Sequence, residues 1–542
     1  MKAAGTPPGQ QFKRAIPGRV GSESTTRSPG SGKALTLPST LAALLIGLAL
    51  VSARQQALFW TFLGSGVGLL VWAAVLYASA RRNHRALVLE VVIRKQHWIQ
   101  ACAQGTILLY WGYHTRLVYP FLPFVVAQLV FAYAFDSLLS LSRRSTYTLG
   151  FGPFPIIFSI NLFLWFQLDW FYWQFAMIAV GFLAKELIRW TREGRRVHIF
   201  NPSSFPLGVF SLALILTGTW GITYATPIAN TQADVPYLYA VIFLVALPGQ
   251  LFFGVARMTL AAVAATYLFS LAYYQITGTY FFYDSHIPVQ VFLGMHLLFT
   301  DPSTSPRSES GRILFGILYA LGVVVFYVLL EMIGAPTLFD KLLPVPILNL
   351  LVRRIDALTA SKPLAALDPG RVGAGLSPMQ RNVAYTGIWT AFFIMLSVTQ
   401  GVGDRHPGQY LPFWTNACQD GSDRACRYAM VLTQIYCVNG SGWACNEAGI
   451  AESARNRRAE SSFKRACDQG FTPGCENLSR AASPTGTWAR GEPVLDDLPI
   501  ILRGTKPRLA ERDPATLYRM GCAQGWPHMC GGSPAGAAGR SR

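Results

Sequence analysis

A series of long apolar segments, separated by short polar loops, constrains this chain more than any other feature. The segment 57–80 contains no charged residue, and most of the others approach the roughly 20 residues that a helix needs to cross a bilayer. Only 13% of the residues are charged and 51% are hydrophobic, so the sequence predicts an all-α polytopic membrane protein. The apolar segments lie at 38–53, 57–80, 99–115, 118–139, 151–168, 170–190, 203–219, 237–254, 259–280, 288–300, 313–333, 336–352 and 383–400.

The loops between these segments differ in their content of Lys and Arg, which predicts their side of the membrane. Loops 220–236 and 281–287 contain neither residue and are expected outside the cytoplasm. The net charge of +19 is then explained by cytoplasmic loops and contact with anionic membrane lipid, and no nucleic-acid-binding motif is visible. The basic loops, expected in the cytoplasm together with the N-terminus, are 81–95, 142–145, 189–196, 307–312 and 353–381.

The apolar and polar stretches divide the chain into six regions; the family resemblance given below implies that the core among them has about ten helices in two related halves. Segments 288–300 and 336–352 are short, so we expect half-helices or re-entrant segments there. The expected regions are a disordered cytoplasmic tail (1–36), two extra transmembrane helices (37–80), the core (81–355), a basic cytoplasmic linker (356–382), a final transmembrane helix (383–400) and an extracytoplasmic region (401–542).

Two polar, Pro-broken runs interrupt the apolar pattern of the core. The runs 201–206 (NPSSFP) and 301–306 (DPSTSP) share the form [Asn/Asp]-Pro-Ser-[Ser/Thr]-x-Pro, and each precedes an apolar helix. Matching interruptions in two membrane halves are a pointer to an intramembrane binding site, because non-helical backbone survives at membrane depth where it lines a cavity. The alternative is that both runs are ordinary helix starts.

The candidate binding residues of this site come from the two runs and the helix that follows the second run. Asn201 and Asp301 are expected to cap half-helices whose N-termini face an anionic group. Hydroxyl and guanidinium groups nearby would add hydrogen-bond donors. The full set of candidate site residues is Asn201, Ser203, Asp301, Thr304, Ser305 and Arg312.

Eight of the nine cysteines lie beyond residue 417, in four pairs of identical C-x7-C spacing. Each first Cys is followed three residues later by Gly, which suits a helical hairpin in which Gly ends the first helix. Pairing within each unit is the simplest connectivity, and it places the region in an oxidising compartment. Cys102, inside an apolar segment, is expected to be a buried thiol. The pairs are Cys418/Cys426, Cys437/Cys445, Cys467/Cys475 and Cys522/Cys530.

Two resemblances follow from these motifs. The Cys units, such as 417–426 and 466–475, resemble Sel1-like repeats, which are helical and bind other proteins. The run 198–218, the run 222–230 and the run FTDPSTSPRSESGRILFG (299–316) together resemble the RnfD/NqrB family over about 80–355. That family comprises the flavin-carrying membrane subunits of Rnf and sodium-pumping NADH:quinone oxidoreductase complexes. The resemblance implies a bacterial inner membrane location with a periplasmic Cys-rich region.

The RnfD/NqrB resemblance also implies a cofactor. Family members carry FMN, which a flavin transferase joins through its phosphate to a Thr. The resemblance is also compatible with a second flavin. Thr226, in the loop 220–236, is the matching residue here. The chain departs from the family site at Trp220 and Tyr224, where the family has Asp and Gly, and Thr226-Pro227 also suits a plain turn.

The function expected on these grounds is electron transfer through FMN held between two helical halves. The electrons would pass to or from redox partner subunits. The family also suggests ion transport as a further property. Two alternatives remain open. One is a flavin-free transporter of a small solute, and the other is a membrane-anchored scaffold that binds an extracytoplasmic protein through the Cys-rich tail. Asp136, in an apolar segment, and His198, at a membrane edge, are the remaining polar candidates.

Overall fold

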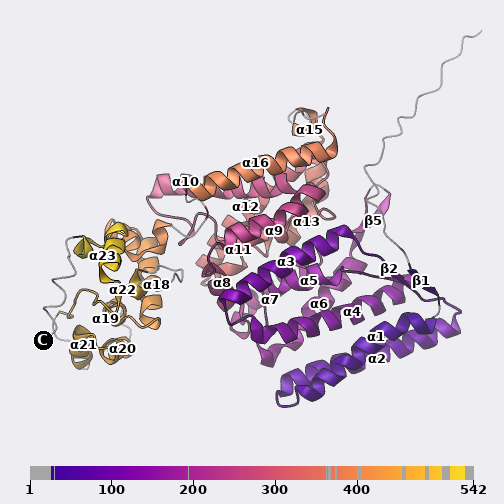
Figure 1. The fold of residues 1–542 in the computed structure, drawn as a ribbon, viewed down its shortest axis with the longest axis horizontal. Coiled ribbons are helices and arrows are strands. Elements are labelled where there is room, and N and C mark those ends of the chain that lie inside the picture. The colour runs from indigo at the N-terminus through magenta and orange to yellow at the C-terminus, as the bar shows by residue number, and fades with distance from the viewer. Residues whose placement is uncertain are drawn as a thin grey trace, which may run out of the picture.

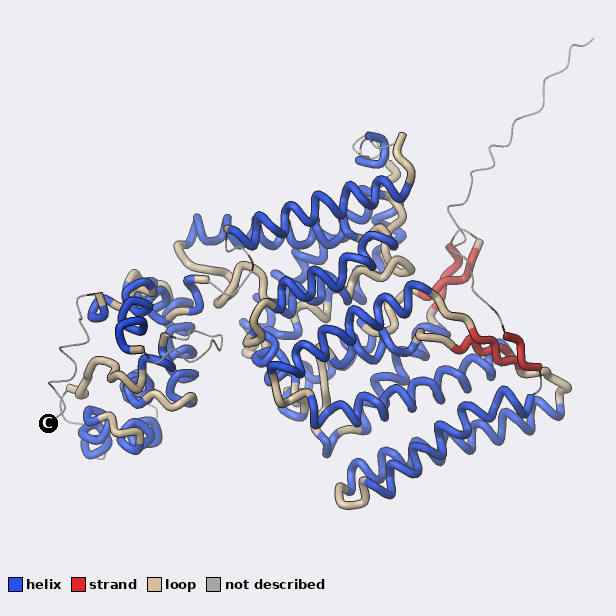
Figure 2. The backbone as a smooth tube through the Cα atoms, in the orientation of Figure 1, coloured by secondary structure: helices blue, strands red, loops and turns tan. Residues whose placement is uncertain are grey.

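A helical bundle and a smaller helical domain at one of its ends make up the molecule (Figure 1). Short strands lie at the opposite end of the bundle (Figure 2). Our computed structural model describes residues 26–29, 31–192, 194–361, 363, 368–372, 375–399, 402, 406–454, 459–481, 487–502 and 513–530. Most of the tail predicted over 1–36 therefore lies outside the described residues, although Thr26–Pro29 forms strand β1 and helix α1 begins at Ser31.

The bundle begins with a hairpin of two long apolar helices, α1 (Ser31–Val51) and α2 (Gln56–Arg82), which packs beside α4. The first half of the core follows this hairpin. Its helices are α3 (Lys95–His114), α4 (Leu122–Arg144), α5 (Pro153–Asn161), α6 (Tyr172–Leu187) and α7 (Ser204–Thr217). Its strands are β2 (Val88–Val91), which pairs with β1 and with β3 (Thr146–Leu149), and the hairpin β4 (Arg189–Arg192) and β5 (Arg195–His198).

The second half of the core contains the remaining bundle helices. They are α8 (Ala225–Ala233), α9 (Leu238–Phe253), α10 (Ala256–Thr277), α11 (Val289–Leu297), α12 (Glu309–Met332), α13 (Pro344–Thr359), the short α15 (Pro369–Val372) and α16 (Pro378–Val398). The buried carboxylate of Glu309 ties α16 to this half. It accepts from Arg381 at 2.9 Å and from the Tyr385 hydroxyl at 2.9 Å, and it lies 2.8 Å from Arg257.

Among the described residues, five helices are long and apolar enough to cross a membrane, fewer than the thirteen apolar segments suggested. They are Gly32–Val51, Gln56–Arg82, Tyr119–Arg144, Ala256–Thr277 and Glu309–Met332. A sixth arises if α8 and α9, which meet at an angle of 98°, form one broken span. The count is lower because several apolar segments fold as short helices joined by non-helical backbone.

Two of these short helices, α5 and α11, have nine residues each, about 14 Å of rise, which is half a membrane thickness. The segment 288–300 does contain a short helix, whereas 336–352 leads into the 16-residue helix α13, and the break after α5 was not foreseen. The buried segment that follows α5 is non-helical, so its peptide groups need partners. Tyr224 N donates to Trp165 O at 2.7 Å, and Gln232 Nε2 donates to Leu162 O at 2.9 Å.

The smaller domain is built from short helices joined by tight turns, as the spacing of the cysteines predicts. All four disulfides join cysteines within one C-x7-C unit. In each unit the Gly ends the first helix with positive φ: Gly421, Gly440, Gly470 and Gly525 have φ of 94°, 104°, 80° and 91°. The helices are α17 (Leu411–Gln419), α18 (Asp423–Val438), α19 (Gly442–Ser453), α20 (Glu460–Asp468), α21 (Thr472–Ala481), α22 (Leu498–Ile501) and α23 (Pro514–Ala523).

Arg424 of α18 fixes the disulfide-bonded domain to the bundle. Its guanidinium donates to the carbonyl of Phe281 and lies 3.6 Å from Glu331 of α12. The same group lies within 6 Å of four ring centroids, a cation–π arrangement, and the rings belong to Tyr273, Phe281, Tyr327 and Tyr428. The domain is therefore docked on the bundle rather than held only by the chain that leads to it.

Removing the buried disulfide Cys437–Cys445 in the variant Cys437→Ser/Cys445→Ser is expected to destabilise the disulfide-bonded domain by about 2–4 kcal/mol, because the unfolded chain gains freedom. Thermal unfolding of purified protein measures the loss. Cys102→Ser is the matched control. The prediction that Cys102 is buried is wrong, since it lies on the outward face of α3 and is exposed. An unchanged melting temperature in the double variant would contradict the structural role of the disulfide.

Candidate functional site

The two Pro-broken runs meet inside the bundle. The side chain of Asn201 in the first run donates to Leu298 O at 2.9 Å, just before the second run. His198 Nε2 lies 3.6 Å from the carboxylate of Asp301. Asn349, fully buried on α13, joins the runs a second time: its Oδ1 accepts from Asn201 N at 3.1 Å and its Nδ2 donates to Thr304 O at 3.2 Å.

The first run starts a helix as expected, and the second does not. Asn201 Oδ1 accepts from the amides of Ser203 at 3.0 Å and Ser204 at 3.3 Å, so it holds the turn that leads into α7, whose N-cap position is Ser203. Asp301 caps no helix, contrary to the prediction. Its carboxylate accepts from Ser303 N at 3.0 Å inside the loop, while Ser308 caps α12 by accepting from Gly311 N at 3.0 Å.

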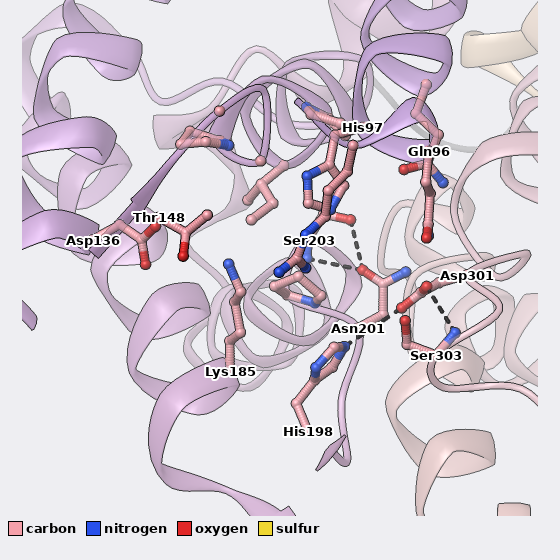
Figure 3. A pocket seen from close by; sticks show the side chains of 18 of the residues that line it. Gln96, His97, Asp136, Thr148, Lys185, His198, Asn201, Ser203, Asp301 and Ser303 are labelled. Carbon is pink, nitrogen blue, oxygen red and sulfur yellow. Dashed lines mark hydrogen bonds and ion pairs between the residues drawn. The ribbon is translucent and has the colours of Figure 1, made fainter. Parts of the chain in front are cut away.

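A cavity of about 380 Å³ opens where the runs meet, and both runs line it. We call it the basic cavity. It lies at the strand-bearing end of the bundle, where α3, α5 and α7 all begin (Figures 1 and 3). Its polar lining residues are Arg94, Gln96, His97, Gln100, Gln104, Asp136, Ser140, Arg144, Thr146, Tyr147, Thr148, Ser159, Lys185, Arg189, Arg196, His198, Asn201, Ser203, Asp301 and Ser303.

The charges around the basic cavity are mainly positive. Five of the lining residues are Lys or Arg, whereas the lining carboxylates are Asp136 and Asp301. Behind the wall, Glu186 pairs with Arg144 at 2.8 Å and with Arg189 at 2.6 Å. Three helix N-termini add partial positive charge at the same end. The cavity is therefore suited to an anionic ligand.

Asp301 is the negative group that both runs share. Burial disfavours its charged form, but hydrogen bonding and charge from His198, with the Ser303 amide, hold the pKa of the Asp301 carboxyl below its usual range. Asp301 therefore stays ionised. Neutral or cationic groups are favoured around it. His198, a polar candidate at a predicted membrane edge, is the group that pairs with Asp301.

Besides His198 Nε2, which has only its ion-pair contact with Asp301, two buried side-chain oxygens of the basic cavity lack a hydrogen-bond partner among the described residues. They are the acceptor Oε1 of Gln104 and the hydroxyl of Tyr147. Gln104 uses its Nε2 to donate to Ser159 at 2.8 Å, which fixes the direction of the amide. An unsatisfied buried polar group costs about 1–3 kcal/mol, so both atoms indicate a ligand with N–H and carbonyl groups.

Three of the candidate residues support the runs rather than line the cavity. Thr304 donates to Asp301 Oδ2 at 3.2 Å, and Ser305 is fully buried, with its carbonyl accepting from Arg192 at 3.1 Å. Arg312 donates to Gly254 O at 2.7 Å and to Pro306 O at 3.0 Å. Their donors are used within the protein, so the expectation that they bind a phosphate finds no support in the geometry.

Thr226 lies elsewhere, at the start of α8, where it lines a second cavity of about 310 Å³. We call this the acidic cavity. It adjoins the disulfide-bonded domain, since Gln409 donates to Asp284 O at 3.2 Å in the loop that lines it. Its lining residues are Thr226, Ala229, Asn230, Ala233, Tyr239, Phe282, Tyr283, Asp284, Pro288, Val289, Gln290, Tyr327, Pro336, Thr337, Leu338, Asp340 and Lys341.

Several residues of the site carried no sequence signal strong enough to select them. Gln104, Tyr147 and Asn349 are single polar residues within apolar or mixed segments, and only the fold brings them together. Lys185, which also points into the basic cavity opposite Asp136 (Figure 3), lies within the apolar segment 170–190 and belongs to no motif. The most useful sequence signal for this site was the short basic and polar stretch from Arg94 to His97.

The fold and the site define a class: an all-helical protein with five candidate membrane spans, four disulfides in an appended domain, and two ligand-sized cavities of opposite charge. Comparison with protein-family models, with curated protein sequences and with solved structures finds no significant match for this chain. The function is therefore argued from the site itself.

Replacing Asn349 by Ala is expected to destabilise the core, because Asn201 N and Thr304 O both lose a partner while they stay buried. Each lost hydrogen bond should cost about 1–3 kcal/mol. Thermal unfolding in detergent measures the effect. Leu350→Ala is the matched control, since Leu350 is the next residue on α13 and its side chain is 55% exposed. Equal melting temperatures for the two variants would show that Asn349 does not join the runs.

Proposed function

We propose that this protein is a membrane-embedded electron-transfer protein that holds a flavin in the basic cavity. The observation that carries the proposal is that the two Pro-broken runs line one cavity, of a volume within the usual range for cofactor sites. The runs are also the part of the chain in which the resemblance to the RnfD/NqrB family is most specific. Their shared pattern is also what predicted an intramembrane binding site between them.

The residues of the basic cavity fit a flavin nucleotide. Lys185 and Arg94 would bind the phosphate of FMN, and Gln104 and Tyr147 would bond the N–H and carbonyl groups of the ring. When bound, the flavin supplies one- and two-electron redox chemistry. The protein orients the ring and sets its potential through these hydrogen bonds and the positive surroundings. Electrons would pass to or from redox partner subunits.

The proposed orientation places the basic cavity at the cytoplasmic side of a bacterial inner membrane. The strand-bearing end carries the basic loops, which favours the cytoplasm. The four disulfides, at the opposite end, favour the periplasm. The exposed apolar side chains of α1, α2 and α12 would contact lipid, and the disulfide-bonded domain would bind a periplasmic partner, as Sel1-like repeats do.

Covalent FMN at Thr226 is a separate proposal, because Thr226 lies in the other cavity. Thr226 is exposed at the start of α8, which is favourable for a flavin transferase. The carboxylates of Asp284 and Asp340 share its cavity and would repel a phosphodiester. A flavin at Thr226 would be a second cofactor, in addition to the one in the basic cavity.

Transport of a small solute is the second candidate function. Two cavities, one towards each end of the bundle and separated by the short helix α11, favour it. A protein that serves only as a scaffold would need neither cavity.

Purified protein expressed without a flavin transferase is expected to release about one equivalent of flavin on denaturation, detected by fluorescence. Lys185→Met should retain about 10-fold less flavin or lower, because a charge-assisted hydrogen bond to the phosphate is lost. Lys464→Met, exposed in the disulfide-bonded domain, is the matched control. Co-expression with a flavin transferase tests Thr226 separately: in-gel fluorescence that survives denaturation should disappear in Thr226→Val.

Each outcome separates the candidates. Released flavin with no in-gel signal supports the basic cavity alone. In-gel signal that depends on Thr226, without released flavin, moves the cofactor to the acidic cavity. No flavin in either form contradicts the electron-transfer function and leaves the transporter as the better candidate.

A further inference from the structure

The acidic cavity has a chemical character opposite to that of the basic cavity. Its acidic and basic lining residues are Asp284, Asp340 and Lys341, so carboxyl groups outnumber amino groups. The cavity is formed by α8, by the N-terminus of α11 and by the loops 282–288 and 336–341, at the end of the bundle next to the disulfide-bonded domain (Figure 1). A buried excess of negative charge is costly unless something positive compensates it.

Asp340 is the most deeply buried carboxylate of this wall, and it forms an ion pair with Lys341. It is 2% exposed, and its Oδ1 accepts no hydrogen bond among the described residues, although Lys341 Nζ lies 3.3 Å away. The ammonium of Lys341 is directed to Gln290 Oε1, at 3.0 Å. Gln290 in turn donates to Gln232 at 3.1 Å, so Lys341 is held by a chain of buried amides. One ammonium thus faces two carboxylates, so the cavity wall has a net negative charge when all three groups are ionised.

Aromatic rings form much of the remaining wall: Tyr239, Phe282, Tyr283 and Tyr327. Two of their hydroxyls are engaged outside the cavity. The Tyr239 hydroxyl donates to Ile287 O at 2.7 Å, and the Tyr327 hydroxyl hydrogen-bonds to that of Tyr428 at 2.8 Å. The rings therefore contribute π-faces and apolar area more than hydrogen bonds. Aromatic walls combined with a carboxylate are the usual means of binding an organic ammonium ion.

We propose that the acidic cavity binds a small organic ammonium ion, with Asp340 and Asp284 balancing its charge and the aromatic rings enclosing its alkyl groups. The volume of about 310 Å³ suits a small ligand. A phosphate would be repelled by the two carboxylates. An inorganic cation would prefer a set of oxygen ligands, and the described residues contain no cluster of three or more His, Cys, Asp or Glu. The proposal does not rest on a flavin in the basic cavity.

Choline is the probe for this site, titrated calorimetrically into the full-length protein expressed without a flavin transferase. We expect saturable binding of choline and none of 3,3-dimethyl-1-butanol, which has nearly the same shape without the charge. Asp340→Asn should weaken choline binding about 10-fold or more, because a buried carboxylate is the main source of the attraction. Asp420→Asn, an exposed position in the disulfide-bonded domain, should leave the affinity unchanged.

A second pair of variants keeps the test valid if Asp340→Asn fails to fold. Asp284→Asn and Tyr283→Leu each remove one feature of the wall, and both should weaken choline binding while the thermal unfolding profile is retained. Absence of saturable choline binding to folded wild-type protein would overturn the proposal. Equal binding of the neutral analogue, or binding of inorganic phosphate that depends on Asp340, would overturn it as well.

Discussion

Backbone that is not helical lies inside an apolar bundle, and every one of its peptide groups must find a partner there. The protein meets this requirement with amide side chains. Asn201 and Asn349 join the two Pro-broken runs, and Gln232 satisfies the carbonyl at the break after α5. Because an amide both donates and accepts, one residue can hold two segments without placing a charge in the interior. The cavities form where these non-helical segments take the place of continuous helices.

The positions of the charges then follow from the chain's direction through the bundle. α3, α5 and α7 begin at the same end, so their positive dipole ends add to the Lys and Arg residues that the loops supply there. At the other end, the loop 281–287, which contains no Lys or Arg, contributes Asp284, and the segment before α13 contributes Asp340 with its ion-pair partner Lys341. The asymmetry that predicts orientation in a membrane thus also gives the two cavities linings of opposite charge.

Sequence reasoning succeeded where local chemistry decides the structure. Equal Cys spacing and a Gly at a fixed offset were sufficient for all four hairpins, because a positive φ is accessible mainly to Gly. The meeting of the two runs also followed from their shared pattern. Asp301, Arg312 and Cys102 were misjudged because their roles depend on which neighbours the tertiary fold provides. Asn349 and Gln104 carried no pattern, and the short strands around the basic loops had only four residues each.

The shortness of α11 has a thermodynamic consequence. Gln290 near its start lines the acidic cavity and Leu297 at its end lines the basic one, a separation of about 10 Å along the helix axis. Opposite charges bound 10–15 Å apart in a protein interior attract by on the order of 1 kcal/mol. Occupancy of either cavity should therefore tighten the other several-fold, and the effect must be equal in both directions. One nine-residue helix would in that way link the two faces of the membrane without any change of shape.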